Sequence, residues 1–124
     1  MRFSKYQNKK TEVDGLVFDS KKEAKYYLVL KQRLNDGEID NLRMQVPYEL
    51  VPAVWKTEVK HLKTKDKEVR KQVQRAVHYV ADFVYTDVHT GDEVVVDTKG
   101  FRTKEYILKR KMMLAFKGIS IVEV

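Results

Sequence analysis

The stretch VVVDTKG, Val94 to Gly100, begins as an apolar strand and ends with an acid and a base two positions apart. Three consecutive β-branched valines are typical of a strand buried in a sheet. Because side chains alternate along a strand, Asp97 and Lys99 are expected to project to the same face. A strand that only filled a core would not end this way, so the stretch indicates a polar site.

The preceding segment predicts a partner strand for this stretch. HYVADFVYTD, residues 78–87, is rich in aromatic and branched residues, and the VHTG that follows predicts a turn between antiparallel strands. If the turn lies there, Asp87 pairs with Asp92, and counting back places Asp82 opposite Asp97. If the turn differs by one residue, the two acids fall on different faces, and the nearby lysine simply neutralises the second acid.

Two carboxylates directly opposite each other destabilise a strand pair and raise each other's pKa. A sequence that places Asp82 and Asp97 in this way needs something to offset their repulsion. A divalent cation is the simplest candidate, because carboxylate and carbonyl oxygens suit hard ions such as Mg²⁺ or Mn²⁺. The first register therefore predicts a metal site, and the second predicts an ordinary ion pair.

A helix is predicted at residues 20–36. Ser20 followed by Glu23 three residues later forms a capping box, and Ala24, Tyr27, Leu28 and Leu34 supply an apolar stripe. The carboxylate of Glu23 has two possible roles. It can bond a backbone N–H of the cap, which local sequence favours, or it can face the two aspartates from a helix packed beside the sheet.

Further elements complete a mixed α/β chain. Asp14-Gly15 predicts a short hairpin, and residues 42–55 carry two prolines that favour an edge or interrupted strand. Thr103 caps a second helix with an apolar side formed by Leu108, Met112, Ala115 and Phe116. The final ISIVEV is predicted to lie parallel to the strand before that helix, because the helix provides the crossover.

The fold class predicted from this order is α/β, with a mixed central sheet flanked by helices. We expect one domain over residues 1–124, with a loose basic arm at about residues 1–10. Residues 56–75 hold eight Lys or Arg and three Asp or Glu. The spacing of Val69, Val73 and Val77 favours a helix, whereas the polar alternation favours a long hairpin, and the extended form is preferred.

Composition limits the class of protein and its partners. A formal net charge of +7 suggests a polyanionic partner, since phosphate backbones are bound largely through Lys and Arg, although a merely basic domain fits equally well. The absence of cysteine excludes disulfide scaffolds, thiolate zinc sites and cysteine nucleophiles. No apolar run is long enough to span a membrane, so no membrane partner is expected. A cytoplasmic location is the expectation.

The residues now assembled resemble a known pattern. Asp82, a hairpin, and then Asp97-Thr98-Lys99, with an acid on the first helix, resemble the PD-(D/E)XK nuclease superfamily, whose restriction-endonuclease-like core runs αβββαβ. Taken together, KYQNKKTEVDGLVFDSKKEAKYY, YVADFVY and VVVDTKG resemble a small phage-encoded family catalogued as a domain of unknown function. The sequence departs from the superfamily pattern at Ala81, where the motif has proline, and at Asp97, where glutamate is commoner.

The resemblance implies a Mg²⁺-dependent endonuclease that hydrolyses phosphodiester bonds in DNA, with Mn²⁺ able to substitute. By position, Glu23, Asp82, Asp97 and Lys99 are the catalytic residues. Asp82, Asp97, the backbone carbonyl of Thr98 and, directly or through water, Glu23 would hold the metal. Lys99 would orient or deprotonate the attacking water.

Two other functions remain open, and the expected partners follow from the charge. The candidate nucleic-acid-binding residues are Lys60, Lys63, Arg70, Lys71, Arg75, Lys109 and Lys111. A non-catalytic nucleic-acid-binding module would use the same basic surface, and an RNA nuclease would use the same site. Branched or junction DNA in phage recombination or replication is a plausible target, and junction-cutting relatives suggest a possible homodimer.

Overall fold

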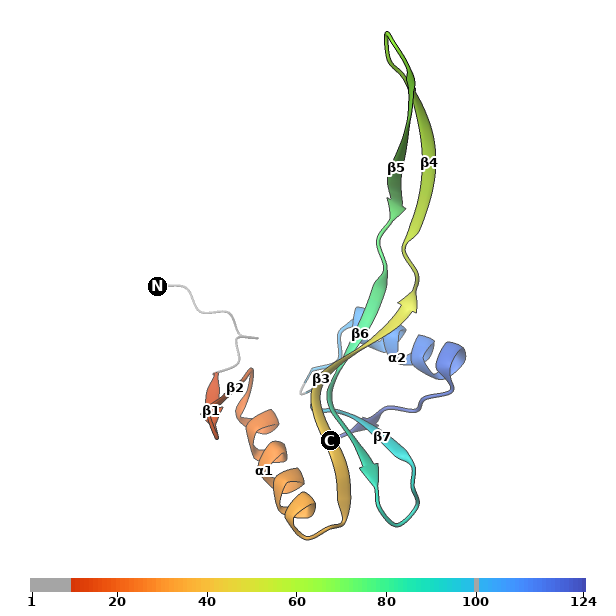
Figure 1. Cartoon of the computed structure of the whole chain (residues 1–124). Helices are drawn as coiled ribbons and strands as arrows, with labels where there is room; N and C mark the ends of the chain where they lie inside the picture. Colours follow the sequence, from red (N-terminus) through yellow and green to blue (C-terminus); the bar gives the residue numbers. More distant parts are fainter. Residues whose placement is uncertain (1–9, 100) are drawn as a thin grey trace.

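The computed structural model describes residues 10–99 and 101–124 (Figure 1). Within these residues the chain forms two helices and three separate sheets. In chain order the elements are β1 (Thr11–Val13), β2 (Leu16–Phe18), α1 (Lys21–Asn35), β3 (Ile39–Val51), β4 (Val54–His61), β5 (Asp66–Gln74), β6 (Val77–Asp87), β7 (Glu93–Asp97), α2 (Lys104–Lys117) and β8 (Val122–Glu123).

The largest sheet has four strands in the order β3-β6-β7-β8. The β3–β6 and β6–β7 pairs are antiparallel, and β7 and β8 are parallel. The predicted parallel placement of the last strand is therefore confirmed, although β8 is only two residues long. Around this sheet the elements follow the order α1, β3, β6, β7, α2, β8, so the predicted mixed α/β class is also confirmed.

The β6–β7 hairpin adopts the first of the two registers considered from sequence. Phe83 pairs with Val96 and Val84 with Val95, and the Asp87 N–H donates to the Asp92 carbonyl at 2.9 Å. The turn at residues 88–91 is thereby confirmed. Continuing this register by one residue brings residue 82 opposite residue 97, where β7 ends.

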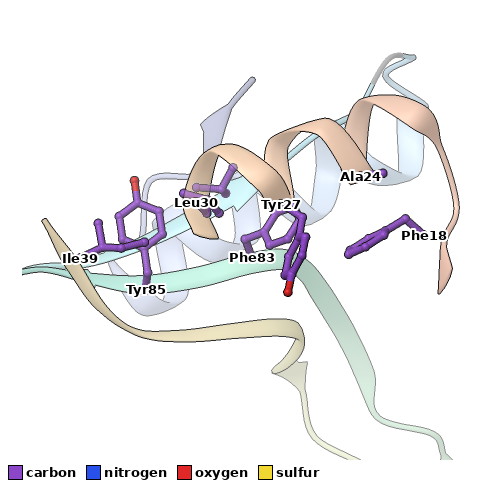
Figure 2. Packing of buried hydrophobic residues seen from close by; sticks show 8 residues of the cluster. Phe18, Ala24, Tyr27, Leu30, Ile39, Phe83 and Tyr85 are labelled. Carbon is purple, nitrogen blue, oxygen red and sulfur yellow. The ribbon is translucent and has the colours of Figure 1, made fainter. Parts of the chain in front are cut away.

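The two helices cover opposite faces of the sheet, because alternate residues of β6 and β7 join different clusters. Phe83 and Val96 pack with α1 in one cluster, and Val84 and Val95 pack in a second cluster with α2. Figure 2 shows the first cluster, in which side chains of α1 lie over those of β6. Its labelled members are Phe18, Ala24, Tyr27, Leu30, Ile39, Phe83 and Tyr85.

Both helices begin where the sequence predicts, but their buried sides differ in part. Ser20 and Thr103 are the N-caps, and each side chain accepts a backbone N–H three residues later. The apolar side predicted for α2 is largely wrong, because Leu108 and Phe116 are 59% and 63% exposed, Ala115 is exposed as well, and Met112 is half-buried. Tyr106 and Met113 form the buried side of α2 instead.

Leu28 is also exposed, contrary to the predicted stripe of α1, whose buried apolar side chains are Ala24, Tyr27 and Leu30. Helical spacing locates an apolar side only to within about one turn, and the sheet decides which residues it covers.

Residues 56–74 lie within the β4–β5 hairpin, and Arg75 follows its end, so the preference for an extended structure is confirmed and the helical alternative is wrong. The hairpin forms a sheet of its own and extends away from the helices and the four-stranded sheet (Figure 1). Pro47 lies in β3, at the edge of the main sheet, and Pro52 follows the end of that strand. These positions suit a residue that lacks an N–H.

The N-terminal hairpin forms as predicted, with Asp14 and Gly15 at φ values of 52° and 77° between β1 and β2. Of the basic arm expected at residues 1–10, residues 1–9 lie outside the described residues. Neither described helix is long and apolar enough to cross a membrane.

Candidate functional site

Asp82 and Asp97 meet at the point where β7 ends. The backbone N–H and the hydroxyl of Thr98 both donate to Oδ2 of Asp82, at 2.9 and 2.8 Å. Asp97 is 1% exposed. Its Oδ2 accepts from the Tyr79 hydroxyl at 2.7 Å, and its Oδ1 accepts from the Lys99 N–H at 2.9 Å. Hydrogen bonds thus hold both carboxylates in fixed positions.

The electrostatics of Asp97 show that the two aspartates interact. Burial raises the pKa of Asp97 above its usual value, and the charge of Asp82 raises it further. The Tyr79 hydrogen bond and the Lys99 charge lower the pKa but do not cancel the increase. A buried carboxyl with a like charge beside it is the arrangement that binding of a cation would relieve.

Lys99 lies near Asp97, but its position is not produced by strand alternation. β7 ends at Asp97, so Lys99 falls outside the strand. Its backbone N–H turns back to the Asp97 carboxylate, and its Nζ lies 5.8 Å from the centre of the Tyr106 ring. The exposed ammonium group is therefore next to the acids and open to solvent.

Glu23 reaches the aspartates from the first turn of α1. Ser20 accepts the Glu23 N–H at 3.1 Å, which is one half of the predicted capping box. The carboxylate of Glu23 instead accepts from Nε2 of Gln45 at 3.0 Å. Glu23 is 6% exposed, and burial, together with the charges of Asp82, Asp19 and Asp97, raises its pKa to about 7, although the Gln45 hydrogen bond opposes the rise.

Gln45 is a site residue that the sequence did not indicate. Met44 pairs with Phe83 and Val46 with Ala81, so Gln45 stands across from Asp82. Its φ of 52° is unusual for a residue in a strand, and such backbone strain often accompanies functional sites. No local pattern reveals this residue, because its role depends on the long-range pairing of β3 with β6.

Tyr79 was also not predicted, since it lies three residues from Asp82 on the same strand, and alternation would place the two on opposite faces. Thr98 was expected to act through its carbonyl, yet its N–H and hydroxyl both serve to hold Asp82.

A hollow of about 320 Å³ opens beside the Glu23–Gln45 pair. It lies between the N-terminal hairpin, the start of α1 and strand β3. Its lining residues are Leu16, Val17, Phe18, Asp19, Glu23, Met44 and Gln45.

Within residues 10–99 and 101–124, no group of three or more His, Cys, Asp or Glu side chains is placed so that it could hold a metal ion. Glu23 therefore influences the aspartates through its charge and does not share a three-carboxylate cluster with them. The carboxylates of Asp82 and Asp97 are the donors that lie together where β7 ends. Mg²⁺ is commonly held by one or two carboxylates and completes its shell with water, so this donor set fits the ion.

The predicted nucleic-acid-binding residues fall in two places. On α2, Lys109 pairs with Glu105 at 2.9 Å, and Lys111 is exposed. The other five candidates lie in or beside the β4–β5 hairpin: Lys60 in β4, Lys63 in the tip, Arg70 and Lys71 in β5, and Arg75 just after it. Arg70 stacks over Trp55, with its guanidinium carbon 4.6 Å from the ring centre.

Fold and site together define a mixed α/β protein in which two aspartates lie close together where β7 ends, with a buried glutamate of α1 within reach of their charges. The chain belongs to the family described as "Protein of unknown function (DUF1064)", whose model matches residues 3–121. The expected membership of a family of unknown function is thereby confirmed. No curated protein and no solved structure matches the chain.

The raised pKa of Glu23 predicts a pH dependence of stability in metal-free buffer. Between pH 4.5, the usual pKa, and about 7, the unfolded chain ionises Glu23 while the folded protein keeps it protonated. The folded state then binds more protons, so its unfolding free energy falls as the pH rises, by roughly 3 kcal/mol in total. Urea unfolding at several pH values should show this fall in the wild type and much less of it in Glu23→Gln.

Glu105→Gln is the matched control for this measurement. Pairing with Lys109 lowers the pKa of Glu105, so this group titrates below the window in question. An equal slope in the wild type and in Glu23→Gln would contradict the assignment.

Proposed function

We propose that the protein is a metal-dependent endonuclease that hydrolyses phosphodiester bonds in DNA. The observation that carries the proposal is the pairing of two buried or half-buried aspartates across the β6–β7 hairpin, with Glu23 close enough to feel both charges. Folding brings these repelling groups together, and cation binding is the function that best explains the arrangement.

Asp82, Asp97 and the carbonyl of Thr98 would hold Mg²⁺ or Mn²⁺, and Glu23 would act through a water. Both Thr98 hydrogen bonds end on Oδ2 of Asp82, so Oδ1 takes no part in those contacts. When bound, the ion would lower the pKa of a coordinated water and neutralise charge on the phosphate.

The side chains of this protein supply the remaining chemistry. Lys99 is exposed beside Asp97, where its ammonium group could orient the attacking water and stabilise the charge that develops on the phosphate. Glu23, with a pKa near 7, could exchange a proton at neutral pH.

The resemblance to the PD-(D/E)XK nucleases supports the same roles. A restriction-endonuclease-like core is consistent with the order α1, β3, β6, β7, α2, β8. Junction-cutting relatives of such enzymes work as dimers, so a homodimer on a branched substrate belongs to this proposal as well.

A non-catalytic nucleic-acid-binding module is the second candidate, and one observation favours it. The carboxylates of Asp82 and Asp97 are already hydrogen-bonded by Thr98, Tyr79 and Lys99, as a purely structural cluster would be. On that view the basic β4–β5 hairpin would bind the nucleic acid, and Asp82 and Asp97 would only stabilise the end of the sheet.

A cleavage assay separates these candidates. Linear duplex, branched and single-stranded DNA and the corresponding RNAs would each be incubated with Mg²⁺, with Mn²⁺, or with EDTA. We expect DNA cleavage with either metal, none in EDTA, and a loss of at least about a hundredfold in Lys99→Ala, since one transition-state contact typically contributes this much.

Lys104→Ala, which removes a nearby exposed lysine of α2, is the matched control and should keep its activity. Cleavage that persists in EDTA would overturn the metal-dependent mechanism. Binding without cleavage under every metal would establish the second candidate, and cleavage confined to RNA would change the substrate but not the site.

A further inference from the structure

The β4–β5 hairpin has two faces of different character, and its register defines them. Lys56 pairs with Lys71 and Lys60 with Lys67, so these four side chains lie on one face, which we call the lysine face. Trp55 and Arg70 lie on the other face, which we call the tryptophan face.

The charges of the two faces are opposite in sign. Between its lysine pairs the lysine face holds Glu58, opposite Val69, so four lysines and one glutamate leave a charge of +3. On the tryptophan face, Arg70 is outnumbered by Glu68 and Asp66, which leaves −1 with His61 neutral. Along the paired strands the positive charge is therefore concentrated on one side of the hairpin, and the tip adds Lys63 and Lys65.

The lysine face carries an energetic cost that the hairpin itself does not offset. Like charges directly opposite each other destabilise a strand pair, and here this occurs twice on one face. Glu58 compensates in part, since its carboxylate pairs with Lys56 at 3.0 Å and its pKa is lowered by Lys56, Lys71 and Lys60. An anionic partner outside the hairpin would balance the remaining charge.

The hairpin also lacks the packing that usually stabilises two strands. It forms a separate two-stranded sheet and extends away from the rest of the chain (Figure 1). Trp55, Val59 and Val73 are all exposed. Isolated hairpins are marginally stable in water, so a long one that projects in this way suits a binding arm whose partner completes its surroundings.

The dimensions of the hairpin match the major groove of B-form DNA. That groove is about 12 Å wide and admits a two-stranded β-ribbon. The two lysine pairs are four residues apart along β4, or about 13 Å at the usual rise of a strand. Long lysine side chains at this spacing can reach phosphates on both sides of the groove.

We propose that the β4–β5 hairpin enters the major groove of duplex DNA, with the lysine face bound to the phosphate backbones. The inference deepens the proposed function, on which it rests for the identity of the polymer, and it names the substrate as B-form duplex. Duplex RNA fits less well, because its major groove is deep and too narrow to be read by side chains.

The arrangement also revises the residues expected from sequence. Lys60 and Lys71 belong to the lysine face, and Lys56 and Lys67 join them. Arg70 lies on the tryptophan face, stacked over Trp55, so it is not one of the phosphate-binding residues of this face. Total charge in the segment did not distinguish these two groups, whereas the strand register does.

The test compares two variants of the full chain in binding a duplex DNA, with EDTA present so that no metal-dependent cleavage occurs. The first neutralises the face: Lys56→Gln, Lys60→Gln, Lys67→Gln and Lys71→Gln. The second exchanges neighbours, so that composition and net charge are unchanged: Lys56→Thr with Thr57→Lys, Lys67→Glu with Glu68→Lys, and Lys71→Gln with Gln72→Lys. It moves three lysines to the tryptophan face.

Both variants are expected to lose at least about tenfold in duplex affinity near 0.1 M salt. Because each phosphate contact contributes about 0.9 to the slope of log K against log salt, the neutralised variant should also have a slope shallower by up to about 3.6. Circular dichroism and thermal unfolding would verify the fold, and Lys60→Gln with Lys67→Gln is the milder variant if four changes unfold the hairpin.

Wild-type affinity in the exchanged variant would overturn the proposal, because it would show that only total charge matters. Weakened binding to duplex RNA with unchanged binding to duplex DNA would overturn it as well, as would unchanged affinity for both in the neutralised variant. Since binding is measured without metal, these results are independent of the cleavage assay, and failure of the nuclease proposal would be seen separately.

Discussion

Replacing Asp97 with asparagine is expected to lower metal-dependent DNA cleavage by at least about a thousandfold while the protein stays folded. The loss follows from removing one of two carboxylates that would hold the ion, whose stabilisation of transition-state charge amounts to several kcal/mol. Initial cleavage rates at saturating Mg²⁺, compared with the wild type, measure the effect.

Asparagine is the suitable substitution because the surroundings of Asp97 can accept it. The Lys99 N–H can still donate to the amide oxygen, and the Tyr79 hydroxyl can turn to accept from the amide nitrogen. The variant also removes a buried carboxyl whose pKa is raised, so its unfolding free energy at neutral pH should not fall sharply.

Asp92→Asn, in the exposed turn of the same hairpin, is the matched control and should cleave at the wild-type rate. Full activity in Asp97→Asn would remove the carboxylate pair from the mechanism. Loss of activity in both variants would point to the hairpin fold and not to the site.

Replacing Phe83 with alanine is expected to lower the free energy of unfolding by about 3–5 kcal/mol, the range usual for truncating a buried phenylalanine. Phe83 is fully buried in the centre of β6 and belongs to the cluster shown in Figure 2. Its ring centre lies 5.7 Å from that of Tyr26 and 6.4 Å from that of Phe18. The cavity would loosen the contact of α1 with the sheet. Urea unfolding followed by circular dichroism measures the change.

Phe116→Ala is the control for this prediction, since it removes the same atoms from a side chain that is 63% exposed. Its unfolding free energy should change by no more than about 0.5 kcal/mol. Similar losses in the two variants would contradict the core described here. Because Phe83 adjoins Asp82 in β6, loss of cleavage in Phe83→Ala has to be compared with its folded fraction.

Much of the fold follows from patterns that lie within a few residues. Ser20 and Thr103 mark the helix starts through their capping side chains, and Asp14-Gly15 and the VHTG turn set two hairpins. These features are predictable because turns and caps depend on local backbone geometry. The VHTG turn also sets the register of the β6–β7 hairpin, and this register brings Asp82 and Asp97 together.

The sequence was a weaker guide to which side of each helix is buried. Leu108 and Phe116 have the spacing of a buried stripe, yet both are exposed, because the sheet covers the side of α2 that carries Tyr106 and Met113. Spacing shows that a helix has an apolar side but not which neighbouring residues a short sheet will reach.

By itself, the sequence determined the helix starts, the hairpin turns, the alternation from Val94 to Asp97 and thus the meeting of Asp82 with Asp97, all through contacts near in the chain. Only the tertiary structure decided the rest. It turned the Glu23 carboxylate from its cap to Gln45 and placed Gln45 across from Asp82. These outcomes depend on which strands pair and in what register, and that choice is made by the burial of the whole core.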